Sequence, residues 1–581
     1  DRRLIQSLGA QDFVRPTLDR FYDSPQGYWR IHYTTTGSDA VYQADVDNNG
    51  NGVPDYVETI GLIADSVYDF EVNQLGYPAP LSDATCPNND DGKVDLYLHN
   101  IQAGFFGFTV ADTNSACGFQ STPMSLPSWI EMDNDFQQIS LYRNRPLDAA
   151  RVTLAHEFFH TIHFTIDWSE NRVLWEMTAT WMEEQMYDDI NDYYTIIPLF
   201  YDHPSRSLQS DVDLHHYAST VWALYLTEKY GSRDIIKHVW LRCGELGLNT
   251  PTDGGDYMQA FAEAIDSASG GADNLASDMN EFAVWNYFTG IYAADAPNAL
   301  GFSEGANYPV IPFDSLDHVD TLPVFVVADS NSHNPDLNAS TYIRFENVNI
   351  TQDSIFNPRF SLSAFPNNWG ISEILELRRP RDSNIVIDTF VVDTNIFDAA
   401  IPNPQQYRTI TFVLTPVDSN GSHFPPPGST FKPQIGYFSG DIAGPADGII
   451  DSQFIAVPAA VLTPYPNPAV VPEMGGADLV FRFQVPTTDS ALYEFTSMSL
   501  VVDLYTVAGE HVATIKEPVD IQIGARQDPH AFNVTYSMSW DMHNQSGHEV
   551  ASGVYLAYAR LYGPGGKQTL AEDRVKVAII R

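Results

Sequence analysis

The spacing of apolar residues changes along the chain and divides it into regions of different secondary structure. Up to about residue 304, apolar residues recur mainly every three or four positions, the spacing of an amphipathic helix. One such helical face is formed by Val57, Ile60, Ile63, Ala64, Val67 and Phe70. Three further helices are predicted at 147–166, 173–187 and 217–230. Alternating segments that begin at Lys93 and at Ser128 predict two strands.

From residue 305, apolar and polar positions alternate in short runs separated by Asn, Asp, Pro and Gly. Runs such as STYIRFENVNI and YRTITFVLTPV have the period of two that puts one face of a strand into a core. The pattern predicts a β-sandwich at 305–458 and a second, smaller sandwich at 459–581. The segment LTPYPNPAVVP, near the boundary, is predicted to be a linker. We therefore predict a multidomain protein in which an α+β domain at 1–304 precedes two all-β sandwich domains.

Composition and charge narrow the classes of partner. The chain has 581 residues, of which 44% are hydrophobic and 13% aromatic, enough for several folded cores. Its formal net charge of −45 argues against binding to nucleic acid or to an anionic membrane surface. No apolar run reaches the roughly 18 residues of a membrane span. Cys86 and Cys117 could pair, whereas Cys243 stands apart in a helical segment.

The segment RVTLAHEFFHTIHF, which begins at Arg151, combines an apolar helical pattern with metal-binding side chains. His156 and His160 are four residues apart, so on a helix they share one face and can bind the same ion. Neutral imidazole nitrogens bind zinc at about 2.0–2.1 Å in a tetrahedral shell. Glu157 points further around the helix, where it can act as general base towards a zinc-bound water. The alternative interpretation is a core helix with two partly buried histidines.

A zinc site on this helix needs a third protein ligand. The extended motif with Gly and His after the second histidine is missing, because His163 and Ile166 occupy those positions. We therefore expect His163 to support the site or pack against it. The next predicted helix, LWEMTATWMEE, offers Glu176, which is 16 residues after His160 and leaves room for a turn. Glu183 lies about 10 Å further along that helix at 1.5 Å per residue.

HEFFH followed by WEMTATWMEE resembles the gluzincin metallopeptidases, and most closely a group of secreted bacterial proteins classed as metalloproteases. The resemblance covers roughly residues 90–300. It implies a gluzincin-type α+β catalytic domain in which Glu176 is the third zinc ligand, Ala179 a small packing residue and Glu183 or Glu184 a trailing acid. It also implies that SWIEMDNDF is an edge strand that binds the substrate backbone, although the residues fit an internal strand equally well.

Peptide hydrolysis also needs a group that stabilises the oxyanion of the tetrahedral intermediate. The segment DLHHYASTVWALYL places His215, His216 and Tyr217 at the start of a predicted helix. Because gluzincins commonly place a Tyr or His from a later helix over the zinc, the resemblance implies Tyr217 as the first candidate and His216 as the second. The alternative is that these side chains cap and pack the helix.

A calcium site is predicted near the N-terminus by DNNGNGVPDYVE, which begins at Asp47. Numbered from one to twelve, the segment matches the ligand positions of an EF-hand loop, with Gly52 at the sharp turn and a helical pattern following. The predicted ligands are the side chains of Asp47, Asn49, Asn51, Asp55 and Glu58 and the carbonyl of Val53. The alternative is an Asn/Gly turn with a helix cap.

The last block, from residue 464, carries YPNP, LYTVAGEHVATI and WDMHNQSGHEVASGVYLAYARL. It resembles the immunoglobulin-like C-terminal modules of secreted bacterial proteins. The resemblance implies an extracellular or cell-surface location, with export or surface attachment as the role of the module. Trp540 and Tyr555 are expected in its core.

Taken together, the sequence predicts a secreted, monomeric zinc endopeptidase that also binds calcium and acts on protein or peptide substrates. In this interpretation Glu157 takes a proton from the zinc-bound water and passes it to the leaving amine. Two alternatives stay open. One is a non-catalytic surface or adhesion protein that keeps a relic of the zinc fold, and the other is an aminopeptidase.

Overall fold

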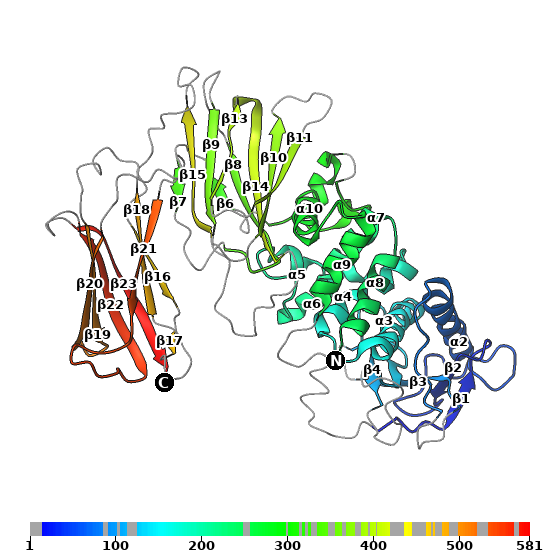
Figure 1. Cartoon of the computed structure of the whole chain (residues 1–581). Helices are drawn as coiled ribbons and strands as arrows, with labels where there is room; N and C mark the ends of the chain where they lie inside the picture. The colour runs from blue at the N-terminus through cyan, green and yellow to red at the C-terminus, as the bar shows by residue number, and fades with distance from the viewer. Residues whose placement is uncertain are drawn as a thin grey trace. The chain divides into compact units, whose positions relative to one another are not determined.

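The computed structural model describes most of the chain, in two compact units that span Asp1–Gly444 and Pro445–Arg581 (Figure 1). The described residues of the first unit are 14–84, 91–101, 105–112, 125–247, 256–297, 300–312, 317–319, 324–326, 334–346, 355–362, 368–377, 385–392, 396–402, 404–418 and 435–443. Those of the second are 460–465, 469–470, 479–486, 498–519, 533–562 and 569–580.

The first unit opens with a five-stranded sheet in the order β1-β2-β3-β5-β4. Its strands are β1 (Arg20–Asp23), β2 (Trp29–Tyr33), β3 (Val94–His99), β4 (Gly107–Ala111) and β5 (Ser128–Asp133). β2, β3 and β5 are parallel, whereas β1 and β4 are antiparallel to their neighbours. The expectation that SWIEMDNDF is an edge strand is therefore wrong. β4 pairs with β5 on its outer side, so β5 is internal and β4 holds the edge.

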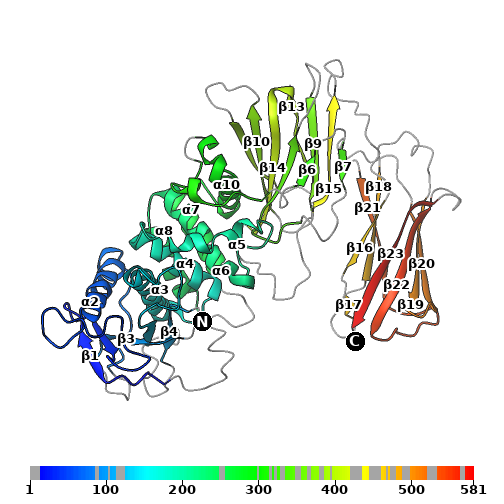
Figure 2. The ribbon, with the colours of Figure 1, turned by 180° about the vertical axis from the view of Figure 1, so that it is seen from behind.

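Two helices cover one face of this sheet (Figures 1 and 2). α2 (Asp55–Tyr68) contacts β1 and β2, whereas α3 (Pro146–Asp167) contacts β4 and β5, and the two helices contact each other. α2 continues into a π-helical turn, η1 (Asp69–Gln74). The apolar faces of both helices and the inner face of the sheet share one core, and its burial is the main stabilising term of this layer.

Seven further α-helices lie in the described residues of the helical part. They are α4 (Arg172–Met186), α5 (Pro198–Tyr201), α6 (His215–Ala218), α7 (Thr220–Tyr230), α8 (Asp234–Leu246), α9 (Tyr257–Ser269) and α10 (Leu275–Tyr287). The helices predicted at 147–166 and 173–187 are confirmed as α3 and α4. The helix predicted at 217–230 is interrupted at Ser219, whose hydroxyl donates to the carbonyl of His215 at 2.9 Å and to that of Leu208 at 3.1 Å.

The rest of the first unit is a two-sheet sandwich with strand orders β11-β10-β14-β8-β6 and β12-β9-β15-β7, with β13 beside β9. Its strands are β6 (Asp317–Val319), β7 (Val324–Val326), β8 (Thr341–Glu346), β9 (Ile355–Leu362), β10 (Asn368–Leu377), β11 (Ile385–Val392), β12 (Ile396–Asp398), β13 (Ile401–Pro402), β14 (Tyr407–Val417) and β15 (Ile435–Ala443). Side chains from both sheets form its inner core.

The sandwich is continuous with the helical part, so the boundary predicted at 304/305 lies inside one compact unit. α10 packs against β10 and β14. Tyr342 donates a hydrogen bond to the carbonyl of Ala283 at 2.8 Å, and Ile374 and Val413 belong to the same core as the helices. One sheet of the sandwich is therefore buried on both faces, by the other sheet and by a helix. The alternation of apolar and polar residues along its strands predicts only one buried face.

The second unit is a smaller sandwich of two sheets, β16-β18-β21 and β17-β23-β22-β19-β20. Its strands are β16 (Ala460–Tyr465), β17 (Ala469–Val470), β18 (Leu479–Pro486), β19 (Met498–Thr506), β20 (His511–Val519), β21 (Asn533–Trp540), β22 (Gly553–Tyr562) and β23 (Thr569–Ile580). Trp540 and Tyr555 lie in its core as predicted, with ring centroids 6.4 Å apart. The segment LTPYPNPAVVP contributes to β16 and β17 and is therefore more than a linker.

Among the described residues no helix is long and apolar enough to cross a membrane. Cys243 is a buried free thiol on α8, whereas Cys86 and Cys117 lie outside the described residues.

Candidate metal centre

The two histidines of HEFFH and the glutamate of the next helix meet between α3 and α4. His156 Nε2 lies 3.2 Å from Glu176 Oε2, and His160 Nε2 lies 3.4 Å from the same oxygen. His156 and His160 are 9% and 8% exposed, and Glu176 is 2% exposed. The carboxylate of α4 therefore faces both imidazoles of α3 inside the protein.

The spacing of these three atoms fits a zinc ion. Two ligands at about 2.0–2.1 Å from an ion with tetrahedral geometry lie about 3.3–3.4 Å apart, close to the two separations observed. One ligand atom from each of His156, His160 and Glu176 falls within 4.8 Å of the others. Two imidazoles and one carboxylate are also the donor types that zinc prefers, so the residues present fit the ion.

In both imidazoles, Nδ1, the ring nitrogen that does not face Glu176, contacts another side chain. His156 Nδ1 lies 2.7 Å from Glu183 Oε1, and His160 Nδ1 lies 3.2 Å from His163 Nδ1. His163 is buried, stacks on Trp240 and approaches the hydroxyl of Thr178 at 3.3 Å. Metal-binding histidines are oriented by such contacts, which direct Nε2 towards the ion.

The electrostatics of the cluster favour a positive charge at its centre. Burial alone would raise the pKa of Glu176, but the neighbouring His160 and His156 hold that pKa well below its usual range. Burial opposes protonation of His156, yet the carboxylates of Glu176 and Glu183 raise its pKa well above the usual value. Two carboxylates around one imidazole stabilise either a proton or a metal cation at this position.

Glu157 lies on the neighbouring face of α3 and is fixed by the edge strand. The hydroxyl of Thr109 on β4 contacts Glu157 Oε2 at 2.8 Å and the Glu157 carbonyl at 2.7 Å. A side chain added at Gly107 would collide with Thr153 at 2.8 Å and crowd the Glu157 side chain at 3.2 Å, so glycine allows β4 to approach α3. Thr109 was not anticipated from the sequence, because it precedes Glu157 by 48 residues without a local signal.

A second unanticipated neighbour is Arg172, whose Nε lies 3.5 Å from Glu176 Oε1. It is placed one helical turn before Glu176 on α4, and the N-cap side chain of Asn171 accepts a hydrogen bond from Val173 N to start that helix. The i,i+4 spacing of Arg172 and Glu176 is visible in the sequence and could have identified this pair.

The two oxyanion candidates differ in position. The ring of Tyr217 lies 6.0 Å from the ring of His156 and nearly parallel to it. Burial, and then the negative charge of Glu176, raises the pKa of Tyr217 well above its usual value, so its hydroxyl stays protonated at neutral pH. His216 is only 1% exposed and lies beside Tyr217, with ring centroids 4.7 Å apart. The geometry favours Tyr217 over His216 as the group nearer the histidine cluster.

The predicted calcium loop is folded around Glu58, the fourth residue of α2. Its two carboxylate oxygens accept hydrogen bonds from the side chains of Asn49 and Asn51 at 2.8 and 2.7 Å. Asp47 accepts from the backbone of Gly50 at 2.7 Å, and from those of Asn51 and Gly52. Loop positions 1, 3, 5 and 12 are thus drawn together. Asp55 accepts hydrogen bonds from the backbone and the side chain of Asn48.

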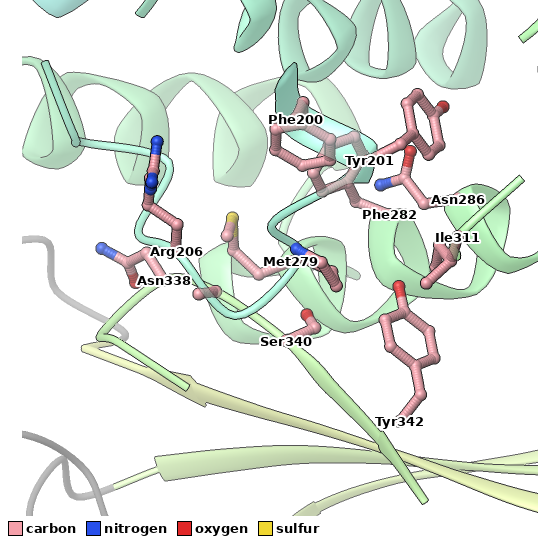
Figure 3. Close-up of a pocket in the computed structure, with 12 residues that line it drawn as sticks. Phe200, Tyr201, Arg206, Met279, Phe282, Asn286, Ile311, Asn338, Ser340 and Tyr342 are labelled. Atoms are coloured by element: carbon pink, nitrogen blue, oxygen red, sulfur yellow. The ribbon is translucent and has the colours of Figure 1, made fainter. Parts of the chain in front are cut away.

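A small hollow elsewhere in the first unit shares no residue with the histidine cluster. It lies between α5, α10 and the segment that leads into β8, and is lined by Tyr201, Met279, Phe282 and Tyr342 (Figure 3). It has room for about one water molecule, so it is a packing defect rather than a substrate site.

His215 provides a test of the packing at the start of α6. It is fully buried and stacks on Phe200 at 5.5 Å, and burial lowers its pKa to about 4. The neutral ring is favoured in the folded state, so stability is lost as the pH falls from 6.5 towards 4, by about 3 kcal/mol. Unfolding free energies measured across this range should decline less steeply in His215→Phe than in wild type. His238→Phe, at an exposed histidine, should keep the wild-type slope, and an unchanged slope in His215→Phe would contradict the assignment.

Comparison with known proteins adds one family match. Residues 130–251 match a family described as "Family of unknown function (DUF6055)". The match covers about a fifth of the chain and includes α3 and α4, and so contains all three clustered ligand residues. No curated protein matches the chain.

Two solved structures are similar to parts of the chain at a low level. A segment covering 25% of the chain is 18% identical to PorZ, a surface component of the type-IX secretion system of Porphyromonas gingivalis, with a TM-score of 0.13. Bacteroides uniformis β-glucuronidase 2 is 12% identical over 53% of the chain, with a TM-score of 0.19. The chain spans 14% of PorZ and 32% of the glucuronidase, and these scores do not define a shared fold.

Proposed function

We propose that the chain is a zinc-dependent peptidase of the gluzincin type, and more specifically a secreted endopeptidase. The observation that carries the proposal is the convergence of His156 Nε2 and His160 Nε2 on one oxygen of Glu176, with Glu157 beside them on α3. A core helix with incidental histidines does not require a buried carboxylate from a second helix at zinc-ligand spacing.

The residues around the cluster have distinct chemical roles in this proposal. When bound by His156, His160 and Glu176, Zn²⁺ supplies a Lewis acid that polarises a peptide carbonyl. Glu157, oriented by the Thr109 hydroxyl, accepts a proton from the attacking water and transfers it to the leaving amine. The protonated hydroxyl of Tyr217 donates a hydrogen bond to the oxyanion of the tetrahedral intermediate.

The substrate is expected to bind along β4. This strand is the sheet edge nearest Glu157, and among the described residues it pairs only with β5. An extended peptide that pairs with the side of β4 opposite β5 would place its backbone beside the general base. The sandwich in the second unit supports an extracellular location, because its sequence resembles the C-terminal modules of secreted proteins.

The proposal is tested with a peptide that is acetylated at its N-terminus and carries a fluorophore and quencher on either side of the cleaved bond. Cleavage that is lost with a zinc chelator and restored by Zn²⁺ supports an endopeptidase. Cleavage only of peptides with a free N-terminus would indicate an aminopeptidase. Absence of cleavage of casein and of both peptide types by the zinc-loaded protein would favour a non-catalytic surface protein.

Glu183 is expected to tune the zinc site without binding the ion. Because its carboxylate contacts His156 Nδ1 at 2.7 Å, Glu183→Gln should weaken zinc affinity by about 10–100-fold. Competition with a fluorescent zinc chelator measures the change. Glu245→Gln, an exposed glutamate on α8, is the matched control and should leave the affinity unaltered. An affinity equal to wild type in Glu183→Gln would show that this contact does not orient the imidazole.

A further inference from the structure

A second group of acidic side chains lies at the end of α4. Glu184 is on the last turn of that helix, Asp188 follows the helix, and Glu304 precedes the short helix η6 (Gly305–Asn307). One carboxylate oxygen from each residue lies within 4.8 Å of the other two. Glu184 is buried, Glu304 is half-buried and Asp188 is exposed, so the group opens from the interior to the surface.

Glu184 carries a buried oxygen atom that no donor group of the described chain satisfies. The side chain is 8% exposed, and its buried Oε2 atom accepts no hydrogen bond from an N–H or O–H group of the described residues. A buried carboxylate oxygen without a donor loses its hydration and gains nothing in return. This oxygen belongs to a side chain that faces two further carboxylates, so a cation is the partner that would satisfy it.

The negative charge of the group is not balanced by nearby basic residues. In the described part of the chain, none of the three carboxylates forms an ion pair with a lysine or arginine. Burial, then the charge of Glu304, and then a hydrogen bond with Asp188 and the charge of Asp188 raise the pKa of Glu184 to about 9. Glu304 is held in place by Tyr193, whose hydroxyl donates to Glu304 Oε2 at 2.7 Å. Like charges at this separation are unfavourable unless a cation or a shared proton lies among them.

We propose that Glu184, Asp188 and Glu304 bind a divalent cation, and that calcium is the ion this site favours. Calcium takes six to eight oxygen ligands, carboxylates among them, in a flexible geometry, and this group offers only carboxylate oxygens. Magnesium demands shorter distances, and zinc prefers nitrogen or sulfur donors. Water and backbone carbonyls would complete the shell.

The consequence of such a site is a link between two distant parts of the first unit. Glu184 and Asp188 belong to the end of α4, the helix that carries Glu176 and Glu183, whereas Glu304 lies in the segment between α10 and the sandwich. A bound cation would fix the end of α4 against that segment. The proposal does not rest on peptidase activity, and it concerns ligands other than those of the loop at Asp47.

The test uses the full chain, with zinc in all samples and Glu58→Gln as the background that disables the Asp47 loop. Thermal unfolding is measured in calcium-free buffer and in excess calcium. Adding calcium should raise the Tm of Glu58→Gln by about 3 °C or more, as expected for a site well above half saturation. The rise should disappear when Glu304→Gln is added, and should persist when the control Glu245→Gln is added.

Either of two results would overturn the proposal. The first is an equal calcium response with and without Glu304→Gln, and the second is no response in Glu58→Gln at all, which would leave a shared proton as the stabilising partner. If Glu304→Gln does not fold, Asp188→Asn carries the same test, because Asp188 is exposed. Inactivity of the protein towards peptides would not affect either measurement.

Discussion

Replacing Glu157 by glutamine is expected to lower peptide hydrolysis by about 10²–10⁴-fold without loss of bound zinc. The amide cannot accept a proton from water, whereas its size and its contact with the Thr109 hydroxyl are retained. The measurement is kcat/KM on the N-acetylated quenched peptide, together with the zinc content of the same preparation. The exposed Glu245→Gln variant should keep the wild-type rate.

The combination of rate and metal content makes this prediction specific. A slow variant that has also lost its zinc would report damage to the site rather than removal of a base. Hydrolysis near the wild-type rate by zinc-loaded Glu157→Gln would exclude Glu157 as the general base and would leave the chemistry proposed for α3 without support.

Replacing Glu176 by alanine is expected to weaken zinc binding by more than about 100-fold, beyond the effect of Glu183→Gln. Glu176 is the only carboxylate whose oxygen faces both imidazole Nε2 atoms among the described residues, at 3.2 and 3.4 Å. Without it, two histidines remain to hold the ion, and hydrolysis should fall together with zinc occupancy.

Competition against a fluorescent zinc chelator gives the affinity of Glu176→Ala, and Glu183→Gln supplies the ranking. The order expected is wild type, then Glu183→Gln, then Glu176→Ala, from tightest to weakest. Equal affinity of Glu176→Ala and wild type would show that the third ligand comes from elsewhere. Circular dichroism of each variant confirms that α3 and α4 are still formed.

The local parts of the site could be predicted from the sequence. The i,i+4 spacing of His156 and His160 places them on one face wherever a helix forms, and α3 forms over almost the expected residues. The separation from His160 to Glu176 leaves room for one turn, and α4 brings the carboxylate back to the imidazoles. The contact between His163 and His160 could also be predicted. His163 stands where the extended metzincin motif has glycine, so it was expected to support the site and not to bind the ion.

The parts that depend on tertiary packing could not be predicted. Nothing local distinguishes β4 from β5 as the edge strand, because strand order is decided by how the sheet packs under α2 and α3. Thr109 contacts Glu157 only because β4 takes the edge position. Glu304 and Glu184 likewise come together through the tertiary fold, since they are far apart in the sequence. The packing of α10 on β14 joins the helical part and the first sandwich, which the pattern of apolar residues separates at 304/305.

The calcium loop shows a mixed outcome. The EF-hand spacing predicted that residues at positions 1, 3, 5 and 12 converge, and Asn49 and Asn51 do meet Glu58. Asp55 was assigned to position 9 of the same site, but it accepts a hydrogen bond from the backbone of Asn48 at 3.0 Å. Calcium binding by this loop stays a prediction, and comparing the calcium-induced rise in Tm of the wild-type chain with that of Glu58→Gln measures it.

The central claim is that one zinc ion is bound between α3 and α4, and anomalous diffraction at the zinc absorption edge tests it most directly. Crystals of the chain purified without added metal should give one strong peak about 2.0–2.1 Å from His156 Nε2, His160 Nε2 and an oxygen of Glu176. A map from zinc-soaked crystals with no peak at this position, and with the Glu176 carboxylate turned away from both rings, would contradict the account.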